Sequence, residues 1–117
     1  DQSNRRYRRK ILEVMEYIDA NLNRKLTLKE IADSIGMNES SLSRLFKNET
    51  GVNLNYYINE KKMKKAMELL RGESSMIKDV AAAVGMDDQL YFNKVFKKYY
   101  NVSPSEFKKK LHPDTEE

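Results

Sequence analysis

The chain has 117 residues, a formal net charge of +4 and an isoelectric point near 9.2. This length suits one domain or two very small ones. The basic excess is modest, and it is compatible with a polyanionic partner or with solvated helix faces. The chain contains no cysteine, which excludes disulfides, thiolate metal sites and a cysteine nucleophile. No apolar run approaches the roughly 20 residues that cross a bilayer, so we expect a cytoplasmic protein without membrane association.

The first predicted helix runs from about Asn4 to Asn21, after three residues that are interpreted as a leader or a remnant of cloning. Apolar side chains recur along one face at helical spacing, at Ile11, Val14, Met15, Ile18 and Leu22. Its beginning is basic, with Arg5, Arg6, Arg8, Arg9 and Lys10. Alternating strand patterns are nearly absent from the whole chain. The sequence therefore predicts an all-α protein of about seven helices.

Residues 26–51 (LTLKEIADSIGMNESSLSRLFKNETG) are typical of two short helices separated by a turn at Gly36. Thr27 and Glu30 have the spacing of a capping box, and Gly36 can adopt the left-handed conformation that ends a helix. One side of the second helix is expected to hold Leu42, Leu45, Phe46 and Glu49. The other side is small, polar and basic, with Ser40, Ser43, Arg44 and Lys47. This layout indicates a helix-turn-helix, although one such corner is equally compatible with a purely structural role.

A long helix is predicted from about Leu54 to Arg71, with Gly72 at its end. Its expected apolar side holds Tyr57, Ile58, Met63, Ala66, Met67 and Leu70, and its expected solvated side holds Lys61, Lys62, Lys64 and Lys65. At 1.5 Å per residue it would span about 27 Å, enough to separate two small units.

The helix-turn-helix pattern then repeats. Ile31, Ala32, Ile35, Gly36 and Met37 correspond 49 residues later to Val80, Ala81, Val84, Gly85 and Met86. After the turn the offset becomes 50, and Leu42, Leu45, Phe46 and Lys47 correspond to Phe92, Val95, Phe96 and Lys97. The extra residue falls in the turn, where insertions are tolerated best, so the pattern favours a true duplication. At the start of the second copy Met76 replaces the capping Thr27, and Ser75 is the alternative cap.

The last predicted helix opens with Ser103-Pro104-Ser105-Glu106, an N-cap followed by proline at the first helical position. Phe107 and Leu111 are its expected core residues, and His112 is expected to be solvated. The predicted organisation is a first helix-turn-helix subdomain over 4–52, a linker helix over 53–72, a second subdomain over 73–111 and an acidic tail over 112–117.

Three segments carry a family resemblance: IADSIGMNESSLSRLFKNETG, YINEKKMKKAMELL and VAAAVGMDDQLYFNKVFKKYYNVSPSEF. Together they resemble the DNA-binding domain of AraC/XylS-type bacterial transcription regulators over about residues 5–111. The resemblance implies sequence-specific binding of double-stranded DNA, with the second helix of each unit in one of two successive major grooves. It implies base contacts from Ser40, Ser43 and Arg44 and from Gln89, Leu90, Tyr91, Asn93 and Lys94.

Arg44 is suited to a bidentate contact with guanine, and the alternatives are a phosphate contact or a surface pairing with Glu39 or Asn48. Gln89 suits adenine or caps its helix. Leu90 and Tyr91 suit thymine methyl groups, unless Tyr91 folds into the core. Lys94 lacks the planar fork of arginine, so the second helix would be less selective for guanine.

Phosphate contacts are expected from basic side chains and from helix starts. The predicted residues are Asn38, Ser41, Lys47, Lys61, Lys62, Lys97 and Lys98. Asp87 and Asp88 would repel phosphate, so they are expected to cap the helix or point away.

The rival interpretations are a helical protein-interaction adaptor and a nonspecific DNA binder. An enzyme is not expected, because the chain has one peripheral histidine and no phosphate-binding loop; no catalytic residue, metal site or cofactor is predicted. The resemblance further implies RNA polymerase as a partner. It also implies an effector, receiver or dimerisation domain outside this fragment, although some members of the family consist of this module alone.

Overall fold

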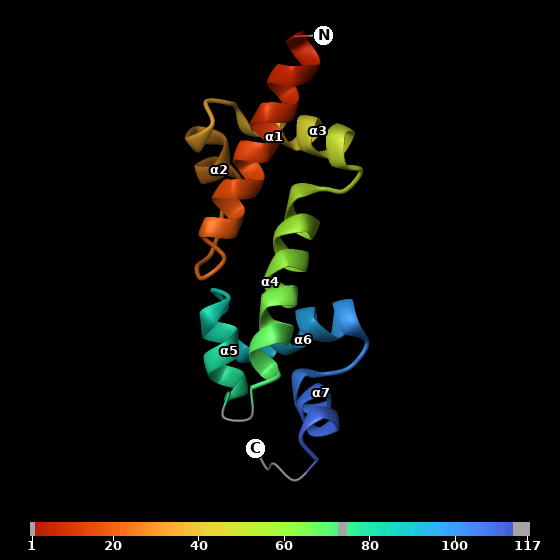
Figure 1. Ribbon diagram of the computed structural model, residues 1–117. Coiled ribbons are helices and arrows are strands. Elements are labelled where there is room, and N and C mark those ends of the chain that lie inside the picture. The colour runs from red at the N-terminus through yellow and green to blue at the C-terminus, as the bar shows by residue number, and fades with distance from the viewer. Residues whose placement is uncertain (1, 73–74, 114–117) are drawn as a thin grey trace. The chain divides into compact units, whose positions relative to one another are not determined.

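The structure is a computed structural model that describes residues 2–72 and 75–113, and these form helices without strands (Figure 1). The helices are α1 (Gln2–Ala20), α2 (Leu28–Ser34), α3 (Glu39–Thr50), α4 (Leu54–Leu70), α5 (Ile77–Ala83), α6 (Gln89–Tyr100) and α7 (Pro104–Leu111). The all-α prediction with about seven helices is confirmed. Helix α1 begins at Gln2, two residues before the predicted start at about Asn4.

The chain divides into two compact units. Unit 1 contains the chain up to Leu22 together with Leu26–Ile58, and unit 2 contains Asn23–Lys25 and the chain from Asn59 onward. Each unit has its own hydrophobic core. The predicted boundaries at residues 52 and 72 stay predictions about how the chain is organised.

The core of unit 1 is built by α1, α2, α3 and the first turns of α4. Its buried residues are Ile11, Val14, Ile18, Ile31, Ala32, Leu42, Phe46, Leu54 and Ile58. Phe46 of α3 packs edge-on against Tyr57 of α4, with ring centroids 5.3 Å apart. The start of α4 therefore serves as the fourth helix of this unit.

The core of unit 2 is built by the second half of α4 with α5, α6 and α7. Its buried residues are Met63, Ala66, Leu70, Ile77, Val80, Ala81, Val84, Met86, Phe92, Val95 and Phe96. Phe96 of α6 packs against Phe107 of α7, with ring centroids 5.9 Å apart. This pair corresponds to Phe46 and Tyr57 of unit 1, so α7 is the counterpart of the first turns of α4.

The duplication is longer than the sequence analysis recognised. At an offset of 52 residues, Ile11, Val14, Met15 and Ile18 of α1 correspond to Met63, Ala66, Met67 and Leu70 of α4. Each unit thus has a long supporting helix, a helix-turn-helix and a closing helix, and α4 is used in both units. The sequence alone concealed this because the apolar side chains differ and the offset changes from 52 to 49 and then to 50.

Glu49, predicted on the same side of α3 as Leu42 and Phe46, is exposed, because the buried stripe consists of Leu42 and Phe46, flanked by Leu45. Two other predictions were wrong. Leu111 is 43% exposed at the last turn of α7, where Lys108 takes the buried position and its Nζ donates to the Ser75 carbonyl. Lys62 is buried rather than solvated, with 4% of its surface exposed.

Candidate nucleic-acid interface

In unit 1 the helix-turn-helix corner is held by local hydrogen bonds. The capping box of α2 is present, with Thr27 Oγ1 accepting from the Glu30 amide at 3.2 Å and Glu30 Oε1 accepting from the Thr27 amide at 3.0 Å. Gly36 ends the helix at φ +70°, and Met37 N donates to the Ala32 carbonyl at 3.0 Å, as in a Schellman motif. Asn38 then caps α3, its Oδ1 accepting from the Ser41 amide at 2.8 Å.

The corner in unit 2 has the same geometry. Gly85 lies at φ +74°, and Met86 N donates to the Ala81 carbonyl at 2.9 Å. Asp88 caps α6, its Oδ1 accepting from the amides of Leu90 and Tyr91. The prediction that an aspartate caps this helix is confirmed, and Gln89 is its first residue rather than its cap. The N-cap of α5 is Met76 without a side-chain bond, so the alternative cap at Ser75 was wrong.

The outward face of α3 carries the residues predicted to contact bases. Ser40 and Arg44 are exposed, Ser43 is half-buried, and Lys47 is exposed one turn further along. Within the described residues, Arg44 makes neither an ion pair nor a hydrogen bond, so its predicted pairing with Glu39 or Asn48 is not formed. The guanidinium is therefore available to a ligand.

The outward face of α6 is partly apolar. Leu90 is 79% exposed and Tyr91 is 50% exposed, so Tyr91 does not fold into the core. Asn93 is half-buried, and its Oδ1 is a buried acceptor without a hydrogen-bond donor in the described part of the chain. Gln89, Lys94, Lys97 and Lys98 are exposed.

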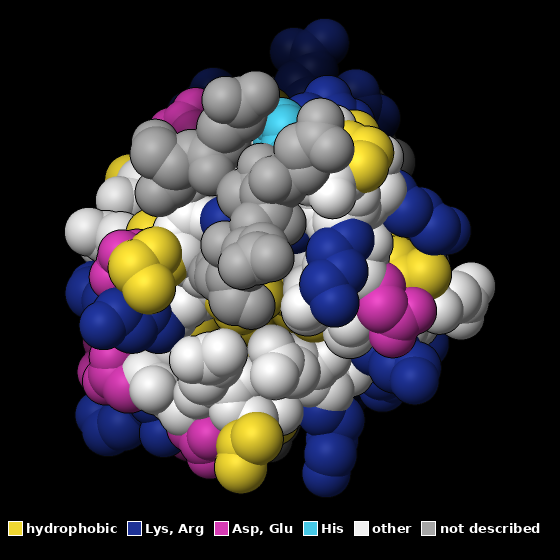
Figure 2. All heavy atoms as spheres, turned by 90° about the horizontal axis from the view of Figure 1, so that it is seen from below, with side chains coloured by type: hydrophobic (Ala, Val, Ile, Leu, Met, Phe, Trp, Pro, Cys, Tyr) yellow, Lys and Arg dark blue, Asp and Glu magenta, His cyan; other side chains and the backbone are white. Residues whose placement is uncertain are grey.

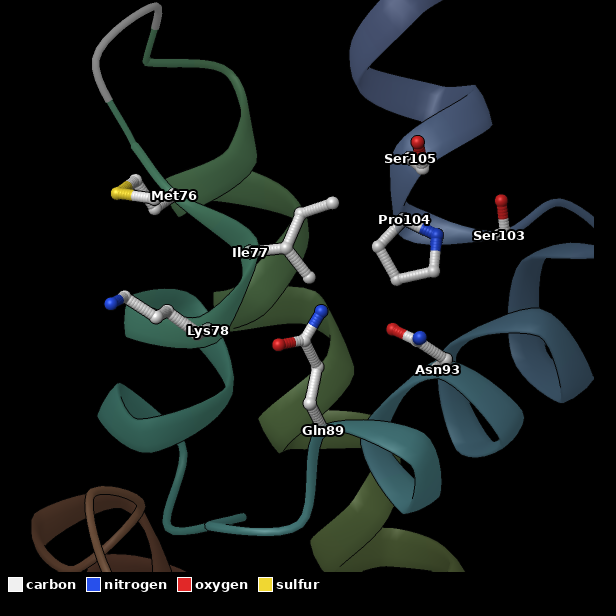
Figure 3. Close-up of a pocket in the computed structure, with 8 residues that line it drawn as sticks. All are labelled: Met76, Ile77, Lys78, Gln89, Asn93, Ser103, Pro104 and Ser105. Atoms are coloured by element: carbon white, nitrogen blue, oxygen red, sulfur yellow. The ribbon is translucent and has the colours of Figure 1, made fainter. Parts of the chain in front are cut away.

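Both recognition faces border a hollow. In unit 2 a hollow of about 380 Å³ lies where α5, α6 and the start of α7 meet (Figure 3). Gln89 and Asn93 point into it from α6, between Ile77 and Pro104 (Figure 3). The corresponding hollow in unit 1 is lined by Leu28, Glu39, Ser40, Ser43 and Arg44. Equivalent helix positions therefore border a recess in each unit.

The residues predicted to contact phosphate fall into three groups. Lys47, Lys97 and Lys98 are exposed. Figure 2 shows lysine and arginine side chains spread around one face of the molecule, with hydrophobic and acidic side chains between them. At the start of α3 the backbone amide of Ser41 donates a hydrogen bond to the side chain of Asn38. Lys61 is half-buried. The prediction for Lys62 was wrong, because its ammonium is enclosed.

Lys62 Nζ donates to the Arg24 carbonyl at 2.6 Å and to the Val84 carbonyl at 2.7 Å, all within unit 2. Burial lowers the pKa of Lys62 to about 8, helped by the nearby charges of Arg24 and Lys65. Sequence spacing missed this role because both acceptors are backbone carbonyls distant along the chain. None of the described helices is long and apolar enough to cross a membrane.

Two helix-turn-helix units with matched, exposed recognition faces define the class of double helix-turn-helix proteins. A family model described as a helix-turn-helix domain matches residues 31–110. The chain belongs to the AraC-type helix-turn-helix family.

Curated relatives and solved structures agree with this assignment. The lactose operon transcription activator of Staphylococcus xylosus is 32% identical over 84% of this chain and 35% of its own length. The C-terminal domain of AraT, a response regulator from Geobacillus stearothermophilus, is 31% identical with a TM-score of 0.83, covering 86% of this chain and 84% of that one. The DNA-binding domain of AdpA, solved with a target DNA, shares the fold at 18% identity, with a TM-score of 0.80 over 89% of this chain and 96% of that one. The chain spans 35–40% of the length of four curated regulators that it matches.

Proposed function

We propose that this chain binds double-stranded DNA sequence-specifically, with α3 and α6 in successive major grooves, and thereby regulates bacterial transcription. The observation that carries the proposal is the matched pair of recognition faces. Ser40, Ser43, Arg44 and Lys47 correspond to Leu90, Asn93, Lys94 and Lys97, on helices presented by the same glycine corner. A helix of this kind fits the width of a major groove.

Arg44 is the principal reader of unit 1. Its exposed, unpaired guanidinium can donate two hydrogen bonds to O6 and N7 of guanine. Ser40 and Ser43 are small enough to let α3 lie deep in the groove, and their hydroxyls bond to bases or phosphates.

The side chains that unit 2 offers to bases differ in chemistry from those of unit 1. Gln89 and Asn93 offer amide groups suited to adenine, and the unsatisfied Oδ1 of Asn93 accepts from a base amino group. Leu90 and Tyr91 offer apolar surface to thymine methyl groups, and Lys94 adds a single-pronged donor. We therefore expect the bases read by α6 to be richer in A·T pairs than those read by α3.

Phosphate contacts are proposed for the exposed cations Lys47, Lys97 and Lys98 and for the half-buried Lys61. Asn38 and Ser41 mark the start of α3, where backbone amides and the helix dipole attract an anion. Lys62 is removed from this set, because its ammonium is committed to two carbonyls.

The complete protein is proposed to join this module to an effector, receiver or dimerisation domain, since the matched regulators are much longer than this chain. The name of the lactose operon transcription activator supports an activating role for this chain. We propose in addition a cytoplasmic location and a contact with RNA polymerase. We propose no enzymatic activity for the module itself.

Selection from a randomised duplex library, followed by affinity measurements at several salt concentrations, tests the proposal. We expect two blocks of preferred bases whose centres lie about 10 base pairs apart, one turn of the duplex. Binding that is equally tight on all sequences would favour the nonspecific binder. Lack of binding to any duplex at about 50 mM salt would favour the protein-interaction adaptor.

A further inference from the structure

We propose that Lys10 and Lys62 are equivalent positioning residues, each fastening the helix-turn-helix corner of its unit to the long supporting helix. In this arrangement they fix how α3 and α6 are presented to DNA. The inference rests on the proposed function, because the elements they position are the two recognition helices. Both lysines act through the corner backbone and do not themselves contact a base.

The acceptors are the cap carbonyls at the ends of α2 and α5. Lys10 Nζ donates to the Ile35 carbonyl at 3.2 Å, and Lys62 Nζ donates to the Val84 carbonyl at 2.7 Å. The Schellman bonds of each corner satisfy carbonyls earlier in the helix, such as those of Ala32 and Ala81, and leave the cap carbonyl to another donor. A cation here also complements the negative end of the helix dipole.

The two links occupy the same place in the duplication. Lys10 and Lys62 are 52 residues apart and precede the buried residues Ile11 and Met63 of their supporting helices. Their acceptors, Ile35 and Val84, are 49 residues apart and directly precede the left-handed glycines. The same tertiary bond is therefore formed twice, by different supporting helices.

Because each bond lies close to the start of α3 or α6, it can restrict the orientation of that recognition helix. The cap carbonyl lies only a few residues before the first residue of α3 or α6, across a turn whose conformation is set by glycine. A cation held by the core helix limits the movement of that turn. Unit 2 is held more firmly, because Lys62 is almost fully buried and also bonds to the Arg24 carbonyl, whereas Lys10 is half-buried.

The test replaces each ammonium by an apolar chain of similar length, as Lys10→Met and Lys62→Met. Matched controls on the same helices are the exposed residues Arg9 and Lys64, as Arg9→Met and Lys64→Met. Base preferences are then measured by selection from randomised duplexes, at a temperature where circular dichroism shows each variant fully folded. Positions read by α3 are those whose preference Arg44→Ala removes, and positions read by α6 are those that Asn93→Ala removes.

We expect a crossed pattern. Lys10→Met should lower discrimination at the positions read by α3 about fivefold or more and leave those read by α6 unchanged, and Lys62→Met should do the opposite. Lys62→Arg, which keeps a cation able to reach the carbonyls, should restore the wild-type preference. The control variants should bind all sequences somewhat more weakly, without a change of preference.

Amide hydrogen exchange without DNA examines the corner separately from DNA binding. In Lys10→Met the amide of Met37 should exchange about tenfold faster, and that of Met86 should be unchanged. In Lys62→Met the amide of Met86 should exchange about tenfold faster, and that of Met37 should be unchanged, because each corner opens locally. If Lys62→Met does not fold, the base preferences and the amide exchange of Lys10→Met test the inference. Unchanged exchange at both corners, or folded variants with wild-type base preferences, would overturn the inference. A wild-type protein without any base preference would instead overturn the proposed function.

Discussion

At the scale of single residues, Lys62 has a strongly shifted pKa. Its pKa is lowered from the ordinary 10.5 to about 8, because burial disfavours the ammonium and Arg24 and Lys65 repel it. Between about pH 8 and 10.5 the unfolded chain binds more protons at this residue than the folded chain does. Its contribution to the free energy of unfolding should therefore rise with pH across that window.

NMR of protein labelled at lysine Cε measures this directly. One resonance should titrate near pH 8, and it should be missing from Lys62→Arg, whose guanidinium stays charged. The rise in stability between pH 8 and 10.5 should be smaller in the same variant. Titration of every lysine resonance above pH 10 would contradict the enclosed ammonium.

Leu90 gives a second prediction at this scale. An apolar side chain that is 79% exposed on a recognition helix has one apolar partner in the major groove, the methyl group of thymine. Replacing one thymine of the selected site by deoxyuridine should weaken binding about fourfold, the equivalent of one CH₂ group. In Leu90→Ala, measured on the same two duplexes, that difference should vanish. Equal affinity of the wild-type protein for all singly substituted sites would exclude methyl recognition by Leu90.

At the scale of elements, the two corner glycines differ in what surrounds them. Both have positive φ, but a Cβ at Gly36 would meet nothing within 4 Å, whereas at Gly85 it would lie 2.4 Å from the carbonyl carbon of Arg24. Gly36→Ala should therefore cost about 1–2 kcal/mol of stability, the penalty of the left-handed conformation alone. Gly85→Ala should cost about 1–3 kcal/mol more, because the Arg24 backbone has to move. Urea denaturation of both variants measures the difference, and equal losses would contradict this close packing.

The individual elements were also where the sequence was most informative. Helical periodicity located the buried faces of α1, α2 and α3, and the capping pairs at Thr27 and Ser103 located two helix starts, because these depend on neighbours three or four residues away. Such reasoning could not predict that Lys62 and Lys108 are buried. Both are buried because their ammonium groups reach backbone carbonyls far along the chain, and periodicity cannot report those carbonyls. The exposure of Leu90 was predicted from its helix face, whereas the position of Tyr91 had been left open between solvent and core. The unsatisfied acceptor of Asn93 was not predicted.

At the scale of the whole molecule, binding should depend steeply on salt. About six phosphate contacts would make log affinity fall with log salt at a slope near −5, about 0.9 for each contact. Lys97→Ala removes one exposed cation from α6 without touching the core, so it should weaken binding to all sequences alike and flatten the slope by about one. Anisotropy titrations from about 50 to 200 mM salt measure both effects. A changed base preference in Lys97→Ala would show that Lys97 reads bases.

The longer duplication also bears on the whole chain. Since α4 closes unit 1 with Leu54 and Ile58 and supports unit 2 with Met63 and Leu70, the two units share one continuous helix. From the sequence, α4 was interpreted as a linker because its length of about 27 Å is enough to separate two small units. In the structure both halves of α4 contribute buried residues to a hydrophobic core, which explains why apolar positions persist along the helix.

The central claim is that exposed side chains of the recognition helices read bases, and Arg44→Ala tests it most directly. Arg44 is exposed and makes no pairing within the described residues, so its removal should change stability by less than about 0.5 kcal/mol. Leu42→Ala, at a fully buried position on the same helix, should instead cost about 2–5 kcal/mol of stability through a cavity.

The decisive measurement is selection from randomised duplexes by wild-type protein and Arg44→Ala, with thermal melts of Arg44→Ala and Leu42→Ala beside it. The account predicts that Arg44→Ala keeps its fold, loses about 1–3 kcal/mol of specific binding and no longer prefers guanine at one position. An Arg44→Ala protein that selects the same sites with the same preference at every position would contradict the account and leave Arg44 as a phosphate contact.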